Sequence, residues 1–174
     1  MSETDALRAA VRDVQDFPKP GIIFKDITPI LADAKLFKQS IHLMAGTLGE
    51  LKIDKIVGIE ARGFIFGAAL AHHLGVGFIP LRKKGKLPWK THEQAYSLEY
   101  GEATIELHQD ALIESERVLL VDDLLATGGT AAAAVKLLEQ LNAQLIGIAV
   151  LVELNFLDGR SKLKPHTIHS ILQY

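Results

Sequence analysis

The chain has 174 residues, of which 48% are hydrophobic and 23% charged, and this composition predicts a globular protein with a substantial core. A net charge of −2 argues against partners held by charge alone, such as nucleic acid or an anionic membrane. No cysteine is present, which excludes disulfides and thiolate metal sites and is compatible with a reducing compartment. Apolar runs are too short for a membrane span, and the charged N-terminus is unlike a secretory signal. We therefore expect one cytoplasmic domain over residues 1–174.

The N-terminal part predicts two helices separated by an irregular apolar stretch. Leu7, Val11 and Val14 recur at helical spacing, which predicts a helix over Thr4–Asp16 that ends before two prolines. Residues 21–31 are apolar without a regular period. The apolar spacing over 36–48 then predicts a second helix.

The rest of the chain alternates strands and helices. Strands are expected over 55–60, 76–81, 118–121, 145–152 and 168–172, and helices over 64–74 and 130–141. Alternating residues over 96–108 predict a two-stranded arm centred on Gly101. This order predicts an α/β fold with a parallel sheet flanked by helices. Its ligands should lie beyond the carboxyl ends of the strands.

The segment VLLVDDLLATGGT, Val118–Thr130, is the most informative part of the sequence. Its strand is followed by two carboxylates, Asp122 and Asp123, which suit a donor-rich diol or a divalent cation. Thr127–Thr130 offers free backbone N–H groups at a helix start, where a phosphate binds well. Together they predict a site for a ribose 5-phosphate. The simpler interpretation is a tight turn with an acidic rim. A Walker A loop is absent, and the acids precede the glycines, opposite to a dinucleotide fingerprint.

Polar clusters also follow two other predicted strands. Arg62 lies at the end of one, where a guanidinium could bind phosphate oxygens or pair with Glu60. Arg82, Lys83 and Lys86 belong to a basic loop at the end of another, which is either solvated or a pyrophosphate site. Because the strands are parallel, we expect these clusters and the acid pair to face one crevice.

Residues 84–108 form a long polar arm that is either an exposed hairpin or a flexible lid. As a lid, it would bring Tyr96, Ser97, Glu99 and Tyr100 to a ligand when it closes. The seven histidines show no spacing that predicts a metal site.

Blocks from Phe17 to Tyr174 resemble one protein family. VLLVDDLLATGGT is similar to the phosphoribosyl pyrophosphate signature of the type I phosphoribosyltransferases. FPKPGIIFKDITPIL, EARGFIFG, RKKGKLP, YSLEYG and the closing LVEL and SILQY resemble members of that family that act on adenine. The resemblance implies transfer of phosphoribose from phosphoribosyl pyrophosphate to adenine, giving AMP and pyrophosphate in purine salvage. It also implies Mg²⁺ as the cofactor and a homodimer. The helix 64–74 is mostly apolar, which suits either a dimer interface or the core of the domain.

The resemblance also implies roles for individual residues. Ala126, Thr127, Gly128, Gly129 and Thr130 would bind the 5-phosphate, and Asp122 and Asp123 the ribose, with either carboxylate free to meet the water shell of Mg²⁺. Arg62, Arg82, Lys83 and Lys86 would hold pyrophosphate, beside a cis peptide between Glu60 and Ala61. The base would lie near Leu124 and Leu125 under a hood, 1–35, through Ile23, Phe24 and Lys25, where many relatives carry arginine at 25. In the lid, Tyr100 would contact the ligand and Glu99 would relay the base's proton.

Two other functions stay open at this point. If backbone groups select the base, side chains do not exclude hypoxanthine, guanine or xanthine. A non-catalytic regulator could use the same fold to sense phosphoribosyl pyrophosphate. Such a protein usually needs a surface or an extra domain for nucleic acid, and no helix-turn-helix segment is visible here.

Overall fold

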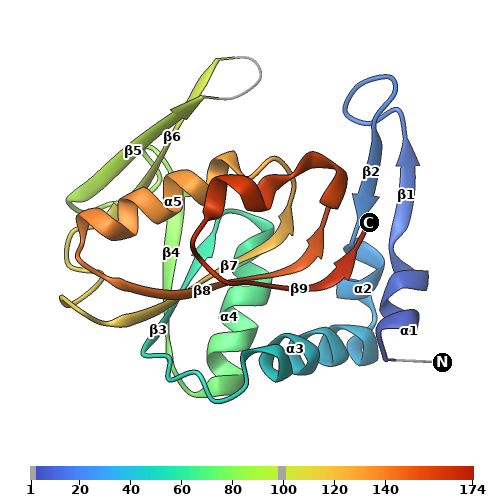
Figure 1. Ribbon diagram of the computed structural model, residues 1–174, viewed down its shortest axis with the longest axis horizontal. Coiled ribbons are helices and arrows are strands. Elements are labelled where there is room, and N and C mark those ends of the chain that lie inside the picture. Colours follow the sequence, from blue (N-terminus) through green and yellow to red (C-terminus); the bar gives the residue numbers. More distant parts are fainter. Residues whose placement is uncertain (1–2, 98–100) are drawn as a thin grey trace. The chain divides into compact units, whose positions relative to one another are not determined.

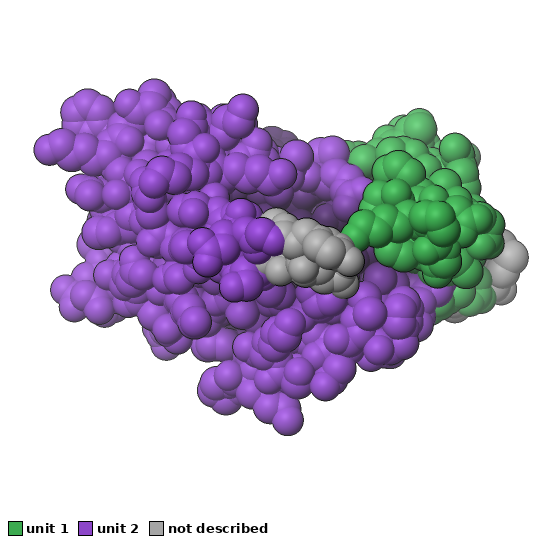
Figure 2. Space-filling model, turned by 90° about the horizontal axis from the view of Figure 1, so that it is seen from above, with its two compact units in different colours: residues 1–43 green, residues 44–174 purple. Residues whose placement is uncertain are grey.

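The computed structural model describes residues 3–97 and 101–174 (Figure 1). The chain divides into two compact units, residues 1–43 and 44–174, which Figure 2 colours separately. Within the described ranges, no helix has the length and apolar content to cross a lipid bilayer.

The first unit contains short helices and a two-stranded antiparallel sheet. Its elements in chain order are α1 (Glu3–Ala10), β1 (Arg12–Gln15), β2 (Ile23–Asp26), α2 (Thr28–Ala32) and the first part of α3 (Ala34–Leu48). α3 continues into the second unit, and it confirms the second predicted helix.

The predicted helix over Thr4–Asp16 is wrong beyond Ala10. β1 pairs with β2 so that Val14 lies opposite Phe24, and Asp13 lies opposite Lys25. A salt bridge of 2.7 Å joins the Lys25 ammonium to the Asp13 carboxylate across this ladder. Val11 and Val14 are three residues apart, a spacing typical of a helix, but pairing with β2, which lies later in the chain, makes Arg12–Gln15 a strand.

The second unit is built on a seven-stranded sheet. Its strands are β3 (Lys55–Ile59), β4 (Gly77–Lys83), β5 (Thr91–Ser97), β6 (Glu102–His108), β7 (Arg117–Leu125), β8 (Gln144–Glu153) and β9 (Ile168–Gln173). They lie in the order β5-β6-β4-β3-β7-β8-β9. The ladders from β4 to β9 are parallel, whereas β6 pairs antiparallel with β4 and β5. This arrangement confirms the predicted α/β class.

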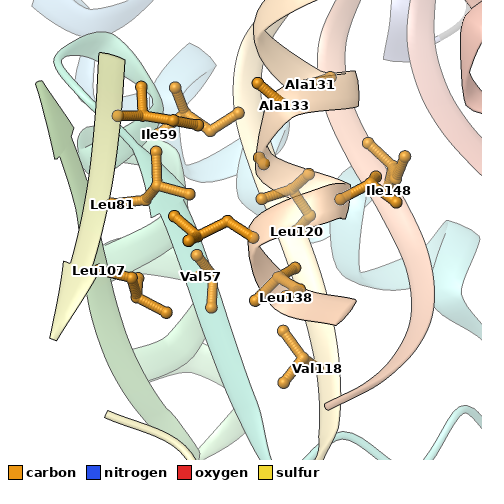
Figure 3. Close-up of a cluster of buried hydrophobic side chains, with 14 of the residues drawn as sticks. Val57, Ile59, Leu81, Leu107, Val118, Leu120, Ala131, Ala133, Leu138 and Ile148 are labelled. Carbon is orange, nitrogen blue, oxygen red and sulfur yellow. The ribbon is translucent and has the colours of Figure 1, made fainter. Parts of the chain in front are cut away.

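Two helices cover opposite faces of this sheet (Figure 1). α5 (Gly129–Gln140) packs on the face that carries Val57 and Leu120, and Figure 3 shows its Leu138 and Ala131 among these side chains. α4 (Arg62–Leu74) lies on the other face, where Gly58 and Gly67 leave room for the ring of Phe78. Burial of these apolar groups is the main stabilising contribution to the unit.

β7 is longer than the sequence predicts. It continues through the two aspartates to Leu125, because β8 pairs with it that far. On its other side, β3 pairs with β7 only as far as Val121. The acids therefore lie on a strand that is paired on one side and open on the other, which leaves room for a ligand beside them.

The predicted arm is rooted in the main sheet. β6 pairs with β4 through Arg82–Glu106 and Lys83–Ile105, and Ile105 and Leu107 are buried. β5 pairs with β6 from Thr91–His108 to Ser97–Glu102, so the described part of the hairpin belongs to the sheet. At the amino ends of the central strands, the Arg117 guanidinium binds both oxygens of Asp54, at 2.8 and 2.6 Å, and joins β3 to β7.

Candidate active site

Ala126–Gly128 join the end of β7 to α5, and the loop Ala126–Thr130 includes the first two residues of that helix. Gly128 has a φ of +77°, a left-handed conformation that favours glycine, and it turns the chain into the helix. Among the described residues, no side chain caps the first turn of α5, and Gly129, Thr130 and Ala131 of that turn line the neighbouring hollow. This hollow measures about 100 Å³, and the whole loop lines it together with Asp122 and Leu124. An anion would find backbone donors and a positive helix end here.

A second hollow of about 370 Å³ adjoins the first, because Ile59, Asp122, Leu124 and Thr130 line both. Its remaining lining residues come from the turn between β3 and α4 and from α4, β4, β5, β6 and β7: Glu60, Ala61, Arg62, Lys83, Tyr96, Ala103 and Asp123. The three polar clusters that the sequence placed at strand ends therefore meet, as predicted.

Asp122 is the carboxylate shared by the two hollows. Its Oδ1 accepts the backbone N–H of Asp123 at 2.8 Å. Burial raises the pKa of Asp122 well above its ordinary value, and the neighbouring Asp123 carboxylate raises it further. The Asp122 side chain packs directly against the backbone of α4 at Gly63. Only glycine allows this, because a β-carbon there would lie 2.7 Å from Oδ1 of Asp122. A hydroxyl-rich or cationic ligand would relieve this unfavourable charge.

Asp123 is buried and has a charged partner. Its Oδ2 lies 2.7 Å from Nε of Arg62, the first residue of α4. The sequence left open a pair between Arg62 and Glu60, and the structure shows instead that Arg62 binds Asp123 and Glu60 binds Arg82. The peptide bond between Glu60 and Ala61 is cis, which confirms the expectation from the family resemblance.

The basic loop, which carries Arg82, Lys83 and Lys86, is held by hydrogen bonds to two carboxylates, Glu60 and Glu106. Glu60 accepts the Arg82 guanidinium at 2.9 and 3.3 Å and the backbone N–H of Lys83 at 2.9 Å. Hydrogen bonds from Arg82 lower the pKa of Glu60, against the effect of burial. Arg82 is thus occupied within the protein, whereas the Lys83 side chain lines the larger hollow.

Glu106 is the second carboxylate, and the sequence analysis did not single it out. It is buried on β6, and its Oε1 accepts the N–H groups of Lys86 and Leu87 at 3.0 and 2.8 Å. Burial by itself raises the pKa of Glu106, but these backbone donors outweigh it and lower the pKa. The available signal was an acid between Ile105 and Leu107.

Among the described residues, the β5–β6 hairpin meets the loop Ala126–Thr130 through one polar contact. The hydroxyl of Thr130 donates to the Tyr96 hydroxyl at 3.3 Å. Glu99 and Tyr100, which the sequence assigns to proton relay and ligand contact, lie outside the described residues.

The residues expected near the base fall in both units. Ile23, Phe24 and Lys25 belong to β2 of the first unit, where their role toward a base stays a prediction. In the second unit, half-buried Leu124 lines both hollows. Leu125 lines the smaller one, but its side chain belongs to the core and is 3% exposed.

Comparison with known proteins identifies the family. Residues 26–171 match the phosphoribosyl transferase domain family. Adenine phosphoribosyltransferase from Acidothermus cellulolyticus is 52% identical over 169 residues, which cover 97% of this chain and 96% of that protein. The chain belongs to the adenine phosphoribosyltransferase family.

Solved structures of this family share the fold closely. Adenine phosphoribosyltransferase from Thermoanaerobacter pseudethanolicus superposes with a TM-score of 0.96 at 51% identity, covering 98% of this chain and 99% of that one. The Saccharomyces cerevisiae enzyme, complexed with an imino-altritol bisphosphate and adenine, has a TM-score of 0.93 at 42% identity, with 98% of each chain covered. The type I phosphoribosyltransferase fold predicted from the sequence is confirmed.

Proposed function

We propose that this protein transfers the 5-phosphoribosyl group of phosphoribosyl pyrophosphate to adenine, giving AMP and pyrophosphate. The observation that carries the proposal is the joined pair of hollows, in which one carboxylate, Asp122, lines both the hollow of the loop Ala126–Thr130 and the hollow that contains Arg62 and Lys83. Relatives that match nearly the whole chain at about half identity are adenine phosphoribosyltransferases.

The smaller hollow would bind the 5-phosphate and the sugar. Backbone N–H groups of Thr127–Thr130 would hold the phosphate oxygens, and Asp122 would accept hydrogen bonds from the ribose hydroxyls. Adenine N9 forms a bond to the anomeric carbon as the bond to the pyrophosphate oxygen breaks, and N9 loses its proton. Positive charge develops on the ribose during this exchange. The Asp122 carboxylate is placed to stabilise that charge.

The larger hollow would bind the departing pyrophosphate. Arg62 and Lys83 line it, and both supply positive charge where negative charge develops. In the ligand-free protein Arg62 is neutralised by Asp123, so pyrophosphate would share its guanidinium with that carboxylate. Arg82 and Lys86 would act mainly by holding the loop that presents Lys83.

Mg²⁺ fits this site as an ion carried by the pyrophosphate. Among the residues that the structure describes, no three His, Cys, Asp or Glu side chains group closely enough to hold a metal. The raised pKa of Asp122 shows that its charged form is disfavoured in this site. A bound cation would stabilise that charged form, so Asp122 offers one carboxylate ligand. When bound, the ion would neutralise part of the charge on the leaving group.

The remaining parts of the proposal concern the base, the lid and the assembly. Ile23–Lys25 and Leu124 would contact adenine, Tyr100 would close over it, and Glu99 would take the proton from N9. We also propose a cytoplasmic homodimer. The exposed Ile65 and Leu74 on α4 support an interface on that helix.

One assay tests the function and the choice of base together. The protein is mixed with Mg²⁺, phosphoribosyl pyrophosphate and one purine at a time, and nucleotide formation is followed. We expect AMP from adenine and no nucleotide from hypoxanthine, guanine or xanthine. Nucleotide formation from another purine would change the substrate, and none at all would favour a sensor of phosphoribosyl pyrophosphate.

A further inference from the structure

The phosphate loop rests on a second backbone segment that lies later in the chain. A β-carbon at Gly128 would lie 2.5 Å from the carbonyl oxygen of Gly159 and 3.2 Å from its Cα. A β-carbon at Gly159 would in turn collide with the carbonyl oxygen of Ala126. Two glycines therefore bring the two backbones into direct contact. Any movement of Gly159 would displace the loop that offers its N–H groups to the phosphate.

Gly159 is held by a network around one buried carboxylate. The next residue, Arg160, binds both oxygens of Glu153 through Nε and Nη2, the latter at 2.7 Å. The hydroxyl of Ser170 donates to Glu153 at 2.6 Å. Glu153 is 2% exposed, and hydrogen bonds from Arg160 and Ser170 keep its pKa low although burial alone would raise it. A two-point guanidinium–carboxylate pair fixes orientation as well as distance.

The Glu153 carboxylate also belongs to the strand that pairs with the residue just before the loop. Glu153 ends β8 opposite Leu125, the last residue of β7. The backbone N–H of the following residue, Leu154, donates to the carbonyl of Leu125 at 2.9 Å. Glu153 thus connects the strand from which the phosphate loop departs to the glycine on which the loop rests.

We propose that Glu153 and Arg160 are positioning residues for the 5-phosphate, acting through Gly159 on the backbone of Ala126–Gly128. The inference rests on the proposed function, because it assigns the 5-phosphate to this loop. Neither side chain lines the two hollows. Their contribution is to hold the N–H donors in the arrangement that the phosphate requires, so that little ordering remains to occur on binding.

The test compares two ligands that occupy different parts of the site. Binding of ribose 5-phosphate and of magnesium pyrophosphate is measured by calorimetry for the wild type, Glu153→Gln and Arg160→Lys. Glutamine removes the charge of the carboxylate, and lysine keeps the positive charge but loses the two-point geometry. We expect the Kd of ribose 5-phosphate to rise about tenfold in both variants, as for a small misplacement of binding groups. The Kd of pyrophosphate should change less than about twofold.

Asp54→Asn is the matched control. It weakens another two-point arginine–carboxylate pair, Asp54–Arg117, which joins the amino ends of the strands. We expect this variant to lose thermal stability and to keep both affinities. If instead it loses ribose 5-phosphate binding as strongly, the effect is general destabilisation and the positioning role is wrong.

Steady-state kinetics separates this inference from the proposed function. In the two variants the KM for phosphoribosyl pyrophosphate should rise more than kcat falls. Failure of the wild type to form AMP would overturn the proposed function. If the wild type forms AMP but Arg160→Lys, the milder variant, binds ribose 5-phosphate as tightly as the wild type does, the positioning role alone is overturned.

Discussion

Nε of Arg62 lies 2.7 Å from Oδ2 of Asp123, so the first residue of α4 is bound to β7 across the larger hollow. The carboxylate is 8% exposed and the arginine 40%. Asp123 therefore depends on Arg62 as its charged partner, while Arg62 keeps a solvent-accessible side that a ligand can reach.

Arg62→Ala is expected to reduce both stability and activity. The buried Asp123 carboxylate would lose its charged partner, and because the pair is partly exposed, we expect a loss of about 1–2 kcal/mol in the free energy of unfolding. The fall in kcat/KM should be larger, about 10²–10³-fold, since the charge facing pyrophosphate is lost as well. Denaturant melts and steady-state assays measure the two effects. Normal kcat/KM in a destabilised variant would contradict the role of Arg62.

Asp122→Asn should stabilise the protein and inactivate it. The folded-state pKa of Asp122 is raised, so the charged form opposes folding as pH rises from the unfolded value of 3.8 through the folded value. Asparagine removes that charge and can still accept the N–H of Asp123. At neutral pH we expect the Tm to rise by about 2–4 °C. AMP formation should fall by at least about 10²-fold. A lower Tm would show that burial does not disfavour this carboxylate.

Gly128→Ala and Gly129→Ala form a matched pair at the start of α5. Gly128 has a positive φ, and its β-carbon would meet Gly159, so alanine there should cost about 1–3 kcal/mol and weaken ribose 5-phosphate binding. At Gly129 a β-carbon meets nothing within 4 Å in a helical position, and alanine should be neutral or stabilising by up to about 1 kcal/mol. Thermal melts compare the two. Equal losses of stability would contradict the close contact between Gly128 and Gly159.

Glu106→Gln tests whether the Glu106 carboxylate holds the basic loop in place. Weaker acceptance of the Lys86 and Leu87 N–H groups should cost about 1–3 kcal/mol and raise the KM for phosphoribosyl pyrophosphate. Glu93→Gln is the control, because its pair with Lys84 is exposed and should contribute no more than about 1 kcal/mol. A KM that changes equally in both variants would argue against a specific role for Glu106.

Stability at acid pH should depend on Asp54. Hydrogen bonds from Arg117 hold the pKa of Asp54 well below its unfolded value of 3.8. The Asp54 carboxylate therefore makes its full contribution to the free energy of unfolding above pH 3.8. That contribution is lost as the pH falls toward the pKa of Asp54 in the folded state. Tm measured between pH 2 and 7 should fall less steeply on the acid side in Asp54→Asn than in the wild type. Identical acid slopes would contradict this linkage.

Local patterns predicted the parts of the molecule that depend on neighbours in the chain. The alternation of apolar strands with helices predicted the parallel sheet, and Asp122 with Thr127–Thr130 predicted a phosphate loop beside a carboxylate. The parallel sheet is confirmed, because strand and helix periods are set within a few residues. The structure places Asp122 and Thr127–Thr130 around one hollow, and phosphate binding there stays a prediction. The helix over Thr4–Asp16 failed for the complementary reason, since β1 forms only where β2 supplies its partner.

The sequence by itself determined which groups gather at the carboxyl edge of the sheet, because parallel strands must end together. The tertiary structure alone decided how the charges pair: Arg62 with Asp123, Arg82 with Glu60, and Arg160 with Glu153. Within the sequence each arginine has several acids at plausible spacing. Only packing brings one carboxylate within hydrogen-bond distance, and burial then makes that choice of partner energetically decisive.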